Sequence, residues 1–199
     1  MRFKKGILVS AGLLTLIVLN VAVTFAQPGG RSGGLNTQSS VLRSSITFQI
    51  KNMGITTGGS IGGLVTHGHF TPANLSSSTL EATVDVNTIN TDNSSRDEHL
   101  RSADFFDVAT YPTISIKSVA LRHKSGNNYT GTFNLTIKDK SKQVEIPFTF
   151  LDKGASVEFK GTFKLIRLDY GVGSTSLVLS DEVIVNIDCE EKKLETASL

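Results

Sequence analysis

Residues 91–112, which read TDNSSRDEHLRSADFFDVATYP, concentrate the side chains best suited to chemistry. Asp97, His99 and Asp104 follow one another closely there, and these are residue types that general acid–base catalysis uses. Two arginines stand among them, and carboxylates beside arginines form ion pairs equally well. We therefore expect an internal cap of ion pairs and hydrogen bonds that closes one end of the fold, and we predict no catalytic residues.

The same stretch carries the signals of a short helix. Ser94 or Ser95 can cap its start, with acidic residues in the first turn and an arginine in the last. We predict a short helical connection at about 95–108. Phe105 and Phe106, near its end, would then insert into an apolar interior, so the stretch is expected to be ordered.

Three further side chains could bind a metal or act as a nucleophile. His67 and His69 lie two apart, so on a strand they would point to the same face, as a pair of metal ligands must. No third ligand follows nearby, and we predict two surface histidines and no metal site. Cys189 ends an apolar alternation and is expected to be a small buried hydrophobe. The chain has no G-x-S-x-G elbow and no P-loop, and we predict no cofactor.

The amino terminus has the pattern of an export signal. Three basic residues precede an apolar run at 7–23, and small residues end the segment at Ala26. We predict a signal peptide at 1–26, a flexible Gly-rich spacer at 27–40, and a periplasmic or secreted protein with no stable membrane insertion after cleavage. An uncleaved anchor is the alternative, because the run approaches the roughly 20 residues that span a bilayer.

Charge and cysteine content narrow the class further. The whole chain has 20 Lys+Arg against 18 Asp+Glu, a net charge of +2, and three of the basic residues belong to the leader. A mature chain so close to neutral argues against a nucleic-acid partner. Cys189 is the only cysteine, so no intramolecular disulfide can form and packing must supply the stability.

Alternation of apolar and polar residues dominates the chain from Ser45 onward, which is typical of strands with one apolar face. The cleanest case is 129–137, where Phe133 and Leu135 alternate with polar side chains. Together with a less regular segment at 61–70, the pattern predicts about eight strands, and the short turns between them favour antiparallel pairing.

Eight such strands form either a sandwich or a closed barrel, and the two-residue alternation alone does not distinguish these two folds. Gly63 and Gly68 lie where a strand must bend sharply, which favours the barrel. Gly58 and Gly59 we expect in a loose hairpin loop instead.

Three segments resemble the YceI-like family of lipocalin-like, polyisoprenoid-binding β-barrel proteins. They are 96–112, the run LIRLDYGVG at 165–173, and the opening strand at 45–54 with the glycines that follow it. One departure is Asn52, where family members often carry His. The resemblance covers roughly 43–188 and implies an exported carrier of a long apolar lipid such as an isoprenoid.

We therefore predict an all-β fold, a single eight-stranded antiparallel lipocalin-like barrel at 41–190, with a charged C-terminal tail at 191–199. The resemblance implies a polyisoprenoid or other long-chain lipid as partner, sequestered or carried in the barrel lumen, and an exposed barrel mouth could pair two copies into a homodimer. The expected ligand-binding residues are apolar positions of the alternating strands: Phe48, Ile50, Val84, Ile116, Phe133, Leu135, Phe148, Phe150, Phe159 and Phe163.

Two alternatives remain open at this point. The same apolar side chains could fill a dry core, in which case the protein is a structural or partner-binding exported domain without a lumen ligand. The other is an enzyme acting on a lipid through Asp97, His99 and Asp104.

Overall fold

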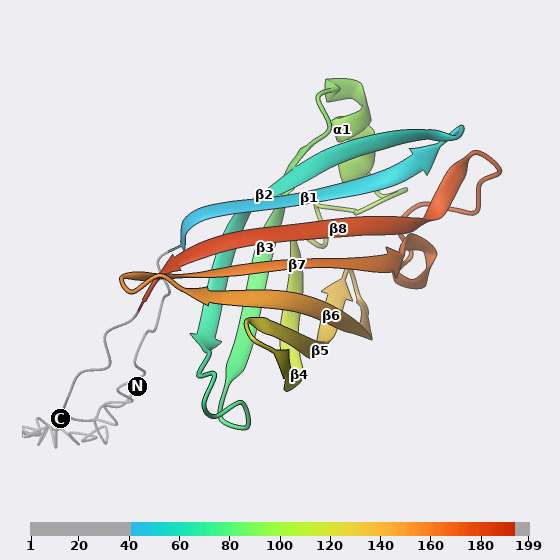
Figure 1. Cartoon of the computed structure of the whole chain (residues 1–199). Helices are drawn as coiled ribbons and strands as arrows, with labels where there is room; N and C mark the ends of the chain where they lie inside the picture. Colours follow the sequence, from blue (N-terminus) through green and yellow to red (C-terminus); the bar gives the residue numbers. More distant parts are fainter. Residues whose placement is uncertain (1–40, 194–199) are drawn as a thin grey trace, which may run out of the picture. The chain divides into compact units, whose positions relative to one another are not determined.

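Antiparallel strands form most of residues 41–193, the part of the chain that the computed structural model describes (Figure 1). The predicted signal peptide at 1–26 and spacer at 27–40 lie outside the described residues, and so does the end of the predicted tail, whose first two residues belong to the last strand. In chain order the elements are β1 (Val41–Asn52), β2 (Ile55–His69), β3 (Thr79–Asn90), α1 (Ser94–Arg101), β4 (Thr113–Ser125), β5 (Asn128–Ile137), β6 (Lys140–Asp152), β7 (Ser156–Ile166), the 3-10 turn η1 (Arg167–Tyr170) and β8 (Leu179–Lys192).

Each strand pairs with the next along the chain, and β1 pairs antiparallel with β8, so the eight strands of the described residues close into a barrel. The prediction of an eight-stranded antiparallel barrel is confirmed. Closure removes the free edges that an open sheet would leave. Short turns join several pairs of neighbouring strands, as the sequence predicted, and Gly126-Asn127 is one of them.

The alternating apolar and polar residues of the strands point to the inner and the outer face of the barrel, respectively. Phe159 lies opposite Phe150 on one neighbouring strand and opposite Cys189 on the other, and Phe163 lies opposite Val185. Partners in an antiparallel register share a face, so these apolar side chains meet inside the barrel. The polar residues between them face outward.

Strand β2 bends where the sequence predicted it. Gly63 has φ +67° next to a shift in the β2–β3 register, and an added Cβ would lie 2.8 Å from the Cβ of Asp85. Pairing of β1 with β2 ends at Ile46 opposite Ile61, whereas β3 pairs with β2 as far as His69. The bend therefore carries the second half of β2 away from β1, as Figure 1 shows.

The prediction of a hairpin loop at Gly58 and Gly59 is wrong, because both lie within β2 and the hairpin tip is Met53-Gly54. Their role is to make room. A Cβ at Gly59 would lie only 2.5 Å from the Cζ of Phe48, so the missing side chain leaves space for that ring.

Helix α1 starts one residue earlier than the predicted cap allows. Asn93 is the N-cap, and its side chain accepts a hydrogen bond of 2.9 Å from the backbone N–H of Arg96, so neither Ser94 nor Ser95 has that role. The helix ends at Arg101, and turns complete the connection that was expected to be helical to about 108.

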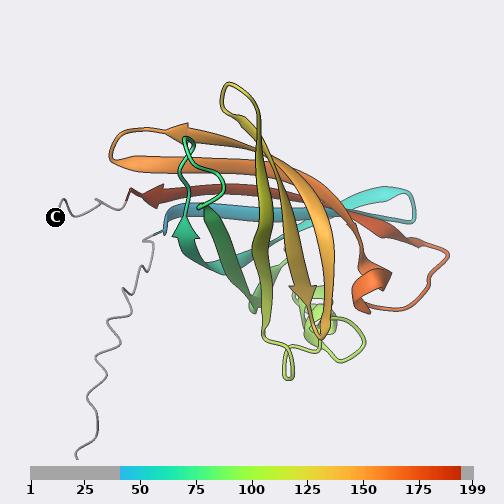
Figure 2. The same ribbon diagram turned by 90° about the horizontal axis from the view of Figure 1, so that it is seen from below.

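The two ends of the barrel carry different closing segments. Figure 1 shows α1 at one end and the loop at 70–78, between β2 and β3, at the other; Figure 2 gives the view from below. The connection that contains α1 shares its end with η1, and the chain enters β1 and leaves β8 at the end with the loop.

Candidate ligand-binding site

The ten residues predicted to line the lumen all lie on the inner face of the barrel, because the strand registers link them to one another or to the buried core. Six of them are buried: Val84, Phe133, Leu135, Phe148, Phe150 and Phe163. The other four are partly buried: Phe48, Ile50, Ile116 and Phe159.

These side chains fill the interior as two clusters. The larger joins Phe133, Leu135 and Phe163 to Tyr170 and Val172 of the η1 segment, with Phe105 and Phe106 packed against it. The insertion predicted for these two phenylalanines is therefore confirmed. They contact the larger cluster at the end of the barrel that carries α1 and η1.

The smaller cluster lies at the other end and is built around Phe70. The Phe70 ring centroid is 5.1 Å from that of Tyr129, 5.8 Å from Phe148, 4.7 Å from Phe150 and 5.7 Å from Phe159. Edge-on and tilted packing at these distances is favourable for aromatic rings. We call this end, defined by these five rings, the aromatic end.

Phe70 was not among the residues predicted to line the lumen. It follows β2 directly, in the irregular segment with the bend, where alternation does not assign a face. The available signal was a lone phenylalanine between a strand and a loop rich in serine. An apolar ring in such a loop has to be buried by folding back over the barrel.

The loop at 70–78 is held together mainly by its own hydrogen bonds. The Ser78 side chain accepts from the backbone of Thr71 at 2.8 Å and donates to the carbonyl of Asn74 at 3.0 Å. In the described part of the chain, the hydrogen bonds of residues 71–78 stay within the loop, and Phe70 and Leu75 supply its apolar contacts to the smaller cluster.

The opposite end is held by buried or partly buried charged side chains, and we call it the anchored end, defined by Asp97, Arg101, Lys138 and Arg167. Arg167 is 3 % exposed and donates to the carbonyls of Ser180 and Val172 at 3.0 and 2.9 Å, and its guanidinium pairs with Asp181 at 2.9 Å. Two further side chains form hydrogen bonds at this end. Arg101 Nη2 donates to the carbonyl of Ile89, and Lys138 Nζ donates to the carbonyls of Phe105 and Gly171.

Of the three residues considered for catalysis, only Asp97 belongs to this anchoring. Asp97 is buried and accepts from both the backbone N–H and the hydroxyl of Thr91. His99 Nε2 lies 3.9 Å from Asp104 Oδ2, and both of these side chains are exposed. One carboxylate is thus fixed in a hydrogen-bonded interior while the other two groups face solvent, so the geometry agrees with the predicted cap and not with an acid–base site.

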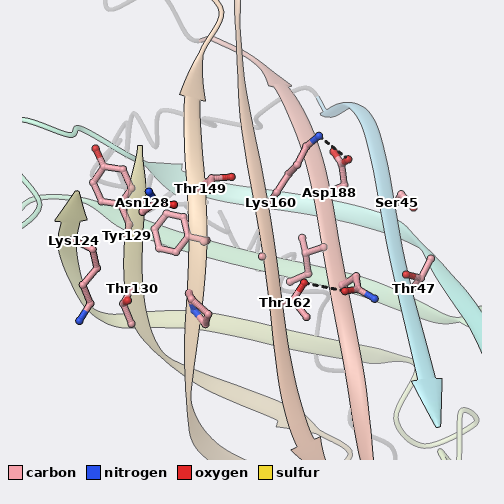
Figure 3. Close-up of a pocket in the computed structure, with 15 residues that line it drawn as sticks. Ser45, Thr47, Lys124, Asn128, Tyr129, Thr130, Thr149, Lys160, Thr162 and Asp188 are labelled. Atoms are coloured by element: carbon pink, nitrogen blue, oxygen red, sulfur yellow. Dashed lines mark hydrogen bonds and ion pairs between the residues drawn. The ribbon is translucent and has the colours of Figure 1, made fainter. Parts of the chain in front are cut away.

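The outer wall of the barrel holds a concave region of about 540 Å³. Figure 3 shows its lining side chains on β4 to β8 and β1, with Lys160 paired to Asp188 at 3.2 Å and Thr162 bonded to Asn186 at 2.9 Å. Most of them alternate in sequence with the lumen residues, and of those predicted for the lumen only Phe148 contributes. Most of its lining side chains are polar, and it shares only Phe148 with the predicted site.

Ion pairs cross the outer wall near the aromatic end. Glu158 on β7 pairs with Lys153 and, at 2.9 Å, with Lys160, and hydrogen bonds from these two ammonium groups lower the pKa of Glu158 to about 2. Arg43 of β1 pairs with Asp188 of β8 at 3.1 Å. The network therefore links β1, β7 and β8 from outside.

Cys189 is 4 % exposed on the inner face of β8, as predicted. Burial is the main cause that raises the pKa of its thiol to about 12, so the thiol stays protonated and unreactive near neutral pH.

His67 and His69 are exposed on β2, and residues 41–193 contain no group of three His, Cys, Asp or Glu side chains placed to hold a metal ion. Neither helical element in that range is long and apolar enough to cross a membrane.

A closed eight-stranded barrel with an apolar interior and plugged ends defines a class of lipocalin-like barrels. The profile of the YceI-like domain family matches residues 40–191, and the chain belongs to this family.

Relatives and solved structures agree with that assignment. A UPF0312 protein of Vibrio cholerae is 30% identical over 118 residues, which cover 55% of this chain and 62% of the relative. Protein YceI of Salmonella newport is 29% identical over 136 residues, 62% of this chain and 69% of the relative. The chain thus spans less than two thirds of the Vibrio relative. None of these names denotes an enzyme.

The crystal structure of BcnA from Burkholderia cenocepacia superimposes with a TM-score of 0.70 at 27% identity, covering 74% of this chain and 95% of that one. A domain from Saccharophagus degradans described as polyisoprenoid-binding and implicated in plant cell wall breakdown has a TM-score of 0.63 at 13% identity, covering 79% and 98%. At that identity the second match establishes the shared fold alone.

Proposed function

We propose that this protein is an exported carrier that holds a long apolar lipid, of the isoprenoid type, in the lumen of its barrel. The observation that carries the proposal is the inner face, which is apolar from the rings around Phe70 to the cluster around Phe133 and Leu135. This face offers few polar partners to a compact, hydrophilic ligand.

Family and fold support the ligand class. The chain belongs to the YceI-like family, and the S. degradans domain that shares its fold is described as polyisoprenoid-binding. Export to the periplasm or beyond is the part of the proposal that rests on the leader pattern at 1–26.

The ligand has to displace side chains, because the two clusters occupy the interior. The aromatic end is the easier end to open. Its loop is attached through Phe70 and Leu75, whereas the anchored end would have to break hydrogen bonds of buried charges such as Arg167. We therefore place the entrance for the lipid at the aromatic end.

The energetics permit this exchange. Burying about 400 Å² of ligand hydrocarbon at about 25 cal/mol/Å² contributes about 10 kcal/mol before ordering costs. Exposing one phenylalanine costs about 1.5–3 kcal/mol. The gain from a long prenyl chain exceeds the cost of exposing the Phe70 ring, so displacing this ring does not by itself prevent binding, whereas a short chain gains less.

The experiment is native mass spectrometry of the protein purified from an export-competent host, followed by solvent extraction of whatever is released. We expect a stoichiometric long-chain lipid. Phe133→Asp should lose it, because an unpaired carboxylate in an apolar interior is costly. Asn134→Asp is the matched control, since Asn134 is exposed on the outer face opposite Lys117. An empty protein that also refuses added prenyl lipid would overturn the proposal.

A packed barrel that works through its surface is the second candidate, and the outer concavity is the observation that favours it. Such a protein would bind a polar partner across β5 to β8. Lys160→Ala and Thr162→Val, which change the concavity, would then abolish partner binding while Phe133→Leu would not. Lipid loading distinguishes the two candidates directly.

A further inference from the structure

Thr66 has a buried hydroxyl group without a hydrogen-bond partner among the described residues. Its side chain is 9 % exposed in the second half of β2. The register places Thr66 opposite Ala82, Ala82 opposite Ile116, and Ile116 opposite Leu135. Since Leu135 belongs to the core, Thr66 faces the lumen as well.

Three other buried hydroxyl groups do have partners. Thr91 donates to Asp97, Ser156 donates to Glu190 at 2.7 Å, and Ser78 bonds within its loop. A buried hydroxyl without a partner destabilises the folded protein, and native structures contain few of them. Thr66 therefore calls for an explanation that the fold itself does not supply.

The surroundings of Thr66 on the inner face are small and apolar. Ala82 is its neighbour across the sheet, Gly68 is the next inner-face position on β2, and Phe70 follows at the aromatic end. The hydroxyl thus lies about 13 Å along the strand from Phe70, since a strand rises about 3.3 Å per residue. It is within reach of a lipid that enters past Phe70.

The same row of residues indicates the charge of the group that could bind there. From Thr66 through Ala82 and Ile116 to Leu135 the row contains no ionisable side chain. A phosphate in this row would be a buried charge without a counterion, which is very costly. A neutral oxygen, such as that of an alcohol or a carbonyl, can accept from or donate to a threonine hydroxyl at little cost.

We propose that Thr66 is the polar anchor of the lumen and that it hydrogen-bonds the neutral oxygen of an otherwise apolar lipid. The inference rests on the proposed lipid-binding function and adds the position and the chemistry of the ligand's polar group. An uncharged alcohol or carbonyl lipid binds with its oxygen beside Thr66, and its hydrocarbon chain runs along the inner face.

The test compares Thr66→Val with wild type for a long-chain prenol and for the hydrocarbon of the same length. Valine keeps the shape and removes the hydroxyl. We expect prenol affinity to fall about three- to tenfold, with hydrocarbon affinity unchanged and with a raised melting temperature of the lipid-free protein. Thr66→Ser should retain most of the prenol affinity. Thr83→Val, the same change beside Ala82 on the outer face, is the matched control.

Two results separate this inference from the function it rests on. If Thr66→Val raises the melting temperature and leaves prenol affinity unchanged, the hydroxyl is not the anchor although the lumen binds lipid. If the wild type binds a prenyl phosphate more tightly than the prenol, the neutral-oxygen assignment is overturned. Failure of the wild type to bind prenol, prenyl phosphate and hydrocarbon overturns the lipid-binding function and the anchor together.

Discussion

At the anchored end, buried charged side chains fasten the closing segments to backbone carbonyls, whereas at the aromatic end a loop is held by the contacts of Phe70 and Leu75. The two kinds of closure respond differently to opening. Hydrogen bonds of a buried charge are lost all at once when a segment moves, and the stranded groups are costly. Apolar contacts can be exchanged for those of another apolar molecule. The anchored end should therefore resist opening more strongly than the aromatic end does.

The largest expected effect is the loss of Arg167. Arg167→Met keeps most of the side-chain volume but strands the carbonyls of Ser180 and Val172 and leaves Asp181 without its partner. We expect the free energy of unfolding in urea to fall by about 3–5 kcal/mol. Lys164→Met removes an exposed ion pair with Glu182 and should cost less than about 1 kcal/mol. Equal losses in the two variants would contradict the anchoring role of Arg167.

Removing the Phe70 ring should destabilise the protein less than the loss of Arg167, but it should have a larger effect on the uptake and release of lipid. Phe70 is only partly buried, so we expect Phe70→Ala to lower the free energy of unfolding by about 1.5–3 kcal/mol. If lipid enters past this ring, uptake and release of a fluorescent prenyl lipid in stopped flow should both become several-fold faster. Phe106→Ala is the matched control at the opposite end, where a partly buried phenylalanine also packs on the core.

The chain contains no tryptophan, so Phe70→Trp and Phe106→Trp each give a protein with a single tryptophan, whose emission can be excited selectively. On addition of prenyl lipid, emission from position 70 should change as the ring is displaced, while emission from position 106 should stay constant. A change confined to position 106 would place the entrance at the anchored end and reverse the comparison.

The regular strands could be predicted from the sequence more fully than the second half of β2 and the loop at 70–78 could. Regular alternation in β5 and β7 assigns an inner face to Phe133 and Phe163 without any knowledge of the fold, and both are buried as predicted. Alternation fails in β2, because the bulge at Gly63 shifts the faces by one position. The inward positions that follow the bulge could therefore not be assigned.

Other features depend on contacts that are distant in sequence. Gly59 lies in a strand and not in a hairpin loop, and the Phe48 ring on β1 uses the space that its missing side chain leaves. The unpaired hydroxyl of Thr66 is visible only once all neighbouring strands are in place. Local sequence patterns specify which side chain faces inward in a regular strand, and they cannot specify which hydrogen-bond partners the assembled interior lacks.

The smallest expected effect concerns the ion pairs that brace the aromatic end from outside. Because the pKa of Glu158 is lowered to about 2, its pairing with Lys153 and Lys160 is fully present above the ordinary glutamate pKa. It is lost as pH falls from about 4.5 through about 2. Glu158→Gln should flatten that part of the profile of melting temperature against pH, with little change near neutrality beyond the loss of the pairing itself.

The same variant sharpens the comparison of the two ends. Glu158 lies on β7 beside the aromatic end, so its loss should loosen the wall around Phe150 and Phe159 and leave the anchored end unaffected. Hydrogen exchange should then increase in β7 and in the loop at 70–78 and stay unchanged in α1. Equal increases at both ends would mean that the barrel opens as one unit, and the aromatic end would then have no separate stability for a lipid to exploit.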